Sequence, residues 1–175
     1  MAEHTRVRVI RSIDGADPVD GYVVAVGEDW FLLLTTLGRL KFDGWDALRI
    51  KDLASVKKLP RRGEVDVHER VMSAAGEWPP RAPVGCDVSS TEAVVRMAME
   101  LDPLVEVHRE KKDPYSFLVG AVTTANEDIA WIYEVDVSGK WTRHRSISVK
   151  KITRLVMGNS YTHALASVIE PIPTD

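Results

Sequence analysis

One short stretch of the chain concentrates the side chains that bind anions. Residues 140–154 carry six formal positive charges, one histidine and no acidic residue, whereas the whole chain has a net charge of −3. Basic side chains can neutralise phosphates, and a neighbouring aromatic ring can stack on a base. The stretch is therefore a candidate site for RNA or single-stranded DNA. The candidate contact residues are Trp141, Arg143, His144, Arg145, Lys150, Lys151 and Arg154.

The same stretch has an alternative interpretation as a solvated basic face whose charges pair with Glu or Asp side chains of the connector. If the stretch forms a strand, Ile147 and Val149 face the core and His144 faces the opposite side. Arg143 and Arg145 share parity with the core residues, so we expect them to project at the loop end of the strand.

Other reactive side chains lack the spacing that catalysis or metal binding needs. The five histidines are far apart, and the single cysteine, Cys86, has no evident base. No phosphate-binding glycine loop or nucleophile elbow occurs. Two carboxylate pairs, Glu28-Asp29 and Glu127-Asp128, lie between apolar segments, where hairpin turns are the expected structure. We therefore predict no catalytic residue, no metal site and no cofactor, and hence a protein that is not an enzyme.

Composition indicates an ordinary globular protein. The 175 residues are 45% hydrophobic and 28% charged, enough for a packed core. No apolar run approaches the ~18 residues of a membrane helix. A single cysteine and the absence of an apolar leader favour a cytoplasmic protein with no membrane association.

The chain contains an internal repeat. Residues 48–56 and 147–155 both have apolar side chains at the first, third, sixth and ninth places and a lysine at the fourth, with an offset of 99 residues. Three further blocks recur in the same order. They pair Glu28-Asp29 with Glu127-Asp128, residues 24–26 with 120–122 at an offset of 96, and Val7, Val9 and Arg11 with Val105, Val107 and Arg109 at an offset of 98.

Each repeated block has the two-residue period of a β-strand. In the second copy the predicted strands cover residues 117–122, 129–137, 141–149 and 152–156. In the first copy, residues 38–42 and 48–51 are predicted as separate strands around a turn at Asp43-Gly44. Five short strands in about 55 residues favour a small sheet that closes on itself.

The middle of the chain differs from both copies. Residues 62–75 have a mixed, helix-compatible pattern, and three prolines in residues 78–83 exclude a regular helix. Ser89 and Glu92 form a capping-box signature before a helix over residues 91–101. We predict a first unit at 1–60, a connector with a helix and a proline-rich segment at 61–88, and a helix plus second unit at 89–175.

A short helix, five bent strands and the apolar spacing of residues 147–155 resemble the Sm-like (LSm) small β-barrel. The whole chain also resembles an uncharacterised bacterial protein family with two such units. The matching features are residues 76–80, 104–108 and 158–161. The resemblance implies a mainly β protein with short helices, made of two tandem Sm-like/SH3-like five-stranded barrels joined by a helical connector.

The RNA-binding signatures of Sm-like proteins are absent. Where that family has Arg-Gly or Lys-His between its last strands, this chain has Lys51-Asp52 and Lys150-Lys151. The resemblance thus implies the fold more than RNA binding. We predict a binding or assembly module that contacts a protein partner or a second copy through exposed barrel edges. The alternative is nucleic-acid binding through residues 140–154.

Overall fold

Alternating apolar residues in two stretches of the chain build the strands. The computed structural model describes residues 4–38, 40–59 and 64–173, with the backbone alone for residues 64–68. The first group of strands is β1 (Arg6–Arg11), β2 (Val19–Val26), β3 (Trp30–Leu37), β4 (Lys41–Arg49) and β5 (Leu53–Lys58). The second group is β6 (Val105–His108), β7 (Phe117–Ala125), β8 (Ile129–Val135), β9 (Trp141–Ser148) and β10 (Arg154–Met157).

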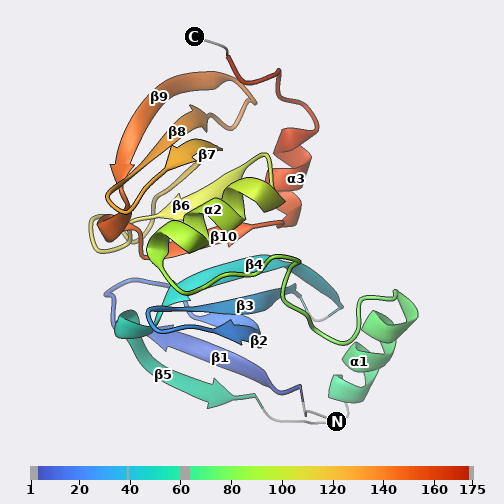
Figure 1. Ribbon diagram of the computed structural model, residues 1–175. Coiled ribbons are helices and arrows are strands. Elements are labelled where there is room, and N and C mark those ends of the chain that lie inside the picture. Colours follow the sequence, from blue (N-terminus) through green and yellow to red (C-terminus); the bar gives the residue numbers. More distant parts are fainter. Residues whose placement is uncertain (1–3, 39, 60–63, 174–175) are drawn as a thin grey trace.

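The ten strands form one continuous antiparallel sheet in the order β5-β1-β2-β3-β4-β10-β6-β7-β8-β9. We call β5 to β4 the first half of the sheet and β10 to β9 the second half. The halves lie one above the other in Figure 1 and meet where β4 pairs with β10 over residues 45–48 and 154–157. The prediction of a mainly β protein with short helices is confirmed.

The two halves have matching hydrogen-bond registers. Gly21 pairs with Thr35 in the first half, and Gly120 pairs with Glu134 in the second, which is an offset of 99 residues. The β2–β3 hairpin has a register shift three residues after Gly21, and the β7–β8 hairpin has one three residues after Gly120. A three-residue 3-10 turn follows β4 as η1 (Ile50–Asp52) and follows β9 as η2 (Val149–Lys151). Residues 48–56 and 147–155 therefore follow the same order of strand, 3-10 turn and strand.

Two details of the sequence prediction are wrong. The registers align residues 120–122 with 21–23 rather than with 24–26, so the offset of 96 is replaced by 99. Asp43-Gly44 is not a hairpin turn but lies inside β4, which merges two predicted strands. Gly44 has φ +79°, and an added Cβ would lie 2.3 Å from the Met157 carbonyl oxygen. The glycine allows β10 and the chain beyond it to approach β4.

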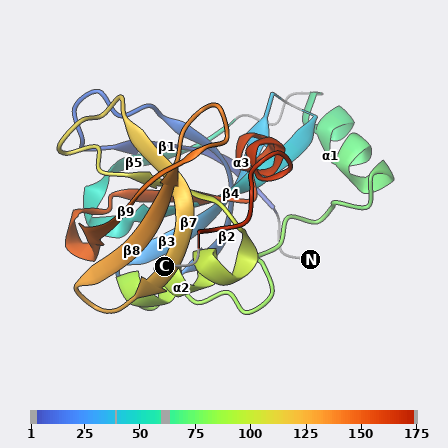
Figure 2. The same ribbon diagram turned by 90° about the horizontal axis from the view of Figure 1, so that it is seen from above.

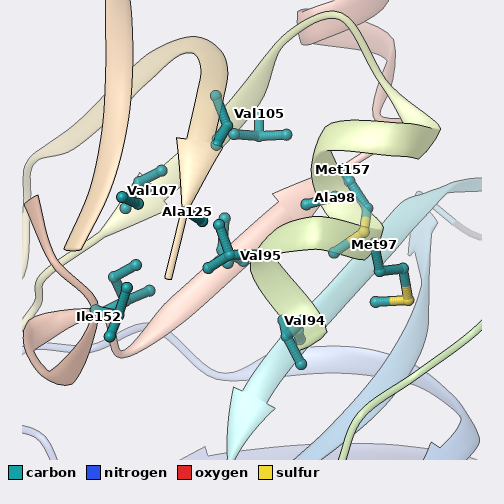
Figure 3. Close-up of a cluster of buried hydrophobic side chains, with 14 of the residues drawn as sticks. Val94, Val95, Met97, Ala98, Val105, Val107, Ala125, Ile152 and Met157 are labelled. Atoms are coloured by element: carbon teal, nitrogen blue, oxygen red, sulfur yellow. The ribbon is translucent and has the colours of Figure 1, made fainter. Parts of the chain in front are cut away.

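Helix α2 (Thr91–Leu101) lies across the boundary between the halves, with Val94, Val95, Met97 and Ala98 buried. Figure 3 shows these side chains gathered with apolar residues of the second half. Trp30 and Leu32 of the first half belong to the same cluster. The N-cap of α2 is Ser90, whose hydroxyl accepts a hydrogen bond from the Ala93 amide, rather than the predicted Ser89. We call this cluster the shared core.

Two other helices lie outside the shared core. Helix α1 (Glu64–Ala74) falls within the predicted helical region of the connector, and Figures 1 and 2 show it to one side of the sheet. Helix α3 (Ser160–Ala166) was not predicted; Asn159 caps it by accepting from the Thr162 amide at 2.8 Å. Trp78, in the proline-rich segment, packs edge-on against Tyr22 of β2.

Candidate anion-binding site

The predicted basic stretch lies at one edge of the sheet. Its residues occupy β9, η2 and the start of β10, so a strand at the sheet edge runs directly into the junction between the halves. Ile147 and Val149 are buried as predicted, and His144 lies on the exposed side. From His144 to Val149 the chain thus has the alternation that its sequence indicates, whereas Arg143 is exposed like its two neighbours.

Most cations of the stretch have carboxylate partners. Arg143 and Arg145 both contact the buried carboxylate of Glu134, the latter at 2.9 Å. These three residues lie on the paired strands β8 and β9. The ammonium of Lys150 lies 2.7 Å from Asp128. The guanidinium of Arg154 lies 2.7 Å from Asp46, across the β4–β10 junction. Much of the positive charge is therefore neutralised, by acids of the sheet and its turns rather than of the connector.

The aromatic residues of this region are engaged with protein groups. Trp141 packs on a small cluster around Leu165, and its indole nitrogen donates to the Glu170 carbonyl at 3.0 Å. His144 stacks on Tyr133 with ring centroids 4.2 Å apart, and Trp131 lies beside it. The side chain of Trp131 is 41% exposed, because its position in the alternation of β8 places it on the outer face. The Trp141 ring is thus less available for stacking on a nucleobase than the sequence indicated.

A second group of cations gathers where the two halves meet. A cleft of about 430 Å³ lies between η1, η2 and the loop that joins β6 to β7. Both 3-10 turns lie at the same end of the molecule, on the left in Figures 1 and 2. We call it the basic cleft. Its basic lining residues are Arg49, Lys51, Arg109, Lys111, Lys112, Lys150 and Lys151.

Among the residues that the structure describes, Asp52 is the one carboxylate that lines the basic cleft. Of the predicted site residues, Lys150 and Lys151 contribute to it. Arg145 is close enough to Arg109 for their charges to interact: burial, together with the charges of Arg143 and Arg109, lowers the pKa of Arg145 against the opposing effect of Glu134. Sequence reasoning missed the five cleft cations outside residues 140–154, because they come from segments about 60 and 100 residues apart.

The β4–β10 junction also holds a buried polar network. Asp46 and Glu106 flank Val156 from opposite sides. Glu106 accepts a hydrogen bond from the Asn159 amide at 2.6 Å and lies 3.3 Å from His108. Each acid therefore has partners that compensate part of the cost of burial. We interpret this network as structural, because it joins neighbouring strands to each other.

No arrangement for nucleophilic or metal chemistry was found in the described part of the chain. Cys86 is partly buried, and burial raises the pKa of its thiol, which disfavours the reactive thiolate. Among the side chains that the structure describes, in residues 4–38, 40–59 and 69–173, no three His, Cys, Asp or Glu groups gather as a metal site would require. The carboxylate pairs are in hairpin turns, as predicted: the Gly27 amide donates to the Trp30 carbonyl around the first pair, and the Asn126 amide donates to the Ile129 carbonyl around the second.

Among the residues described, no helix has the length and apolar character needed to cross a membrane. Comparison with known proteins finds no matching family model, no matching curated protein and no matching solved structure.

Proposed function

We propose that this chain is a cytoplasmic, non-enzymatic binding module made of two tandem Sm-like small β-barrel units, which binds a partner protein by adding its strand to a free sheet edge. The equal strand order and equal registers of the two halves support the duplication. The resemblance stated from sequence supports the fold type. No described side-chain group supports catalysis.

The observation that carries this proposal is the pairing of β4 with β10. Here the fourth strand of one half pairs with the fifth strand of the other, through four residue pairs. Each half has two edge strands, its fourth and its fifth. Because β4 and β10 pair with each other, β5 of the first half and β9 of the second half remain at the ends of the sheet. An unpaired edge strand is a template for a further strand.

Charge disfavours a second copy of the chain as the added strand. If β5 of one molecule met β9 of another in the register of β10 on β4, Lys57 would face Arg145 and Lys58 would face His144. Like charges directly opposite on neighbouring strands are destabilising. At the internal junction the position of Arg145 is taken by Asp46, and that of Lys57 by Val156.

The edge at β5 instead favours an acidic strand. Lys57 and Lys58 are exposed, and neither has a carboxylate partner among the described residues. A strand with a carboxylate at the position of Asp46 would face Lys57 and replace repulsion by attraction. The partner class is thus a protein with an exposed, acidic β-segment.

The test uses the chain's own β4 as the probe. A labelled synthetic peptide of residues 41–49, which contains Asp46, should bind the intact protein in an anisotropy titration. Lys57→Glu in the protein, or Asp46→Lys in the peptide, should weaken binding about tenfold. The two changes together should restore binding, because the charge pair is reversed.

Two results would remove the proposal or its partner class. No peptide binding at any concentration, with a strict monomer in light scattering, would remove edge-strand binding. A mass that grows with protein concentration and is insensitive to Lys57→Glu would make the added strand that of a second copy.

Nucleic-acid binding through residues 140–154 is the second candidate. Its support is the continuity of Lys150 and Lys151 with the basic cleft. It has less support than edge binding because Glu134, Asp128 and Asp46 already neutralise four of the six cations.

A further inference from the structure

We propose that the basic cleft binds a compact anion that carries several phosphate groups, held mainly by Lys51, Arg109, Lys112 and Lys151. This site is separate from the free edges at β5 and β9, and it does not depend on the edge proposal.

The first argument is charge. Seven basic side chains and one carboxylate line the cleft, a formal excess of six positive charges in a chain whose net charge is −3. A concave site lined by one sign of charge focuses the field and raises the local concentration of counter-ions. The lining residues come from both halves of the sheet, so the site exists only because the halves are joined.

The second argument is that the protein neutralises only part of the surplus. Arg49 donates to the Ile152 and Val149 carbonyls, Lys111 lies 2.5 Å from Asp52, and Lys150 pairs with Asp128. The other four cations have no carboxylate partner among the described residues. Lys51, Lys112 and Lys151 are exposed and Arg109 is half-buried. These four are available to an external anion.

The third argument is that hydrogen bonds hold the cleft walls in place. Arg49 of the first half donates across the cleft floor at 2.7 and 3.0 Å to carbonyls in and beside η2. Arg11 of β1 forms a fully buried ion pair with Glu110, which fixes the start of the β6–β7 loop. In that loop the Lys112 amide donates to the Arg109 carbonyl at 2.8 Å. The backbones that carry the free cations are therefore fixed before a ligand arrives, which lowers the entropy cost of binding.

The composition of the lining defines the ligand class. Arginine and lysine are the side chains that bind phosphate oxygens, and the described lining of the cleft includes no aromatic ring. Without a ring there is no platform for a nucleobase, so recognition rests on charge. The volume of about 430 Å³ suits a compact molecule rather than a long strand. The expected ligand is thus a small molecule with clustered phosphates.

The experiment titrates the full chain with inorganic tripolyphosphate by calorimetry at low salt, with orthophosphate and a ten-nucleotide oligothymidine as parallel probes. One tripolyphosphate should bind per chain, more tightly than orthophosphate, with affinity that falls as salt rises. The variant Lys112→Ala with Lys151→Ala removes one exposed cation from each of two walls. It should weaken tripolyphosphate binding by about tenfold or more.

The matched control is Lys57→Ala with Lys58→Ala, which removes the same charge from β5, outside the cleft. It should leave the affinity within about twofold, and unchanged thermal unfolding of both variants would show that they are folded. Equal losses in both variants would overturn the proposal, as would an absence of tripolyphosphate binding at low salt. Oligothymidine that binds more tightly and displaces tripolyphosphate would overturn the compact ligand class.

Discussion

Two buried acids at the junction between the halves respond to their surroundings in opposite ways. Burial raises the pKa of Asp46, although the charge of Arg154 acts against that effect. Burial also acts to raise the pKa of Glu106, but hydrogen bonds from His108 and Asn159 outweigh it and lower that pKa. The difference follows from the partners: Glu106 has two hydrogen-bonding side chains, whereas the direct partner of Asp46 is Arg154, in an ion pair.

These shifts predict opposite effects of pH on stability. Asp46 is protonated more easily in the folded chain, so its contribution falls as pH rises from its ordinary pKa of 3.8 through its folded-state pKa. Glu106 contributes stability that is present above its ordinary pKa of 4.5 and is lost as pH falls through its folded-state pKa.

Urea unfolding of the parent protein, Asp46→Asn and Glu106→Gln between pH 3 and 8 measures both effects. The stability of the parent relative to Asp46→Asn should decrease with pH, and that relative to Glu106→Gln should increase, each by at most about 1.4 kcal/mol per pH unit. Parallel curves for the two comparisons would contradict the assignment of partners.

At the scale of elements, Gly44 of β4 sets how closely the halves can join. Gly44 has a positive φ and no space for a side chain, because an added Cβ would lie 2.3 Å from the Met157 carbonyl and 2.6 Å from the Asn159 amide. Both atoms belong to the backbone and cannot rotate away. Gly85 has a similar φ of +73° but nothing within 4 Å of its added Cβ.

The two glycines separate backbone strain from steric conflict. Gly85→Ala should lower the free energy of unfolding by about 1–2 kcal/mol, the energy of holding an alanine in the left-handed conformation. Gly44→Ala should lower the free energy of unfolding by about 1–3 kcal/mol more than Gly85→Ala does, because it also overpacks the β4–β10 junction. Chemical denaturation of both variants measures the difference. Equal losses would mean that the junction can move apart without cost.

The elements themselves were largely predictable from local sequence. Strand alternation and α2 follow from patterns within ten residues. The 3-10 turns after residues 49 and 148 were not predicted. Gly44 was misread because a glycine after aspartate indicates a turn by local rules, whereas here it accommodates a chain more than a hundred residues away. The basic cleft could not be predicted for the same reason. Lys51, Arg109 and Lys151 are brought together only by the pairing of β4 with β10.

At the scale of the molecule, the shared core joins two halves that each have strands of their own. Leu32 and Leu33 are neighbours on β3 and point to opposite faces. Leu32 lies in the shared core with α2, whereas Leu33 lies in a cluster made only of first-half residues. Trp30 of β3 also joins the first half to α2 by a hydrogen bond, which its indole nitrogen donates to the Thr91 hydroxyl at the start of that helix. Such a continuous sheet and core favour cooperative unfolding of the two halves.

The variant Leu33→Ala tests that cooperativity, because it removes apolar volume from the first half alone. Deleting a buried leucine side chain should cost about 2–5 kcal/mol. If the halves unfold together, the most protected amides of β7 and β8 should lose as much hydrogen-exchange protection as those of β2 and β3. Leu32→Ala in the shared core is the comparison and should affect both hairpins in either case. Unchanged protection in β7 and β8 of Leu33→Ala would mean that the second half unfolds independently, and the basic cleft would then lose one wall whenever the first half opens.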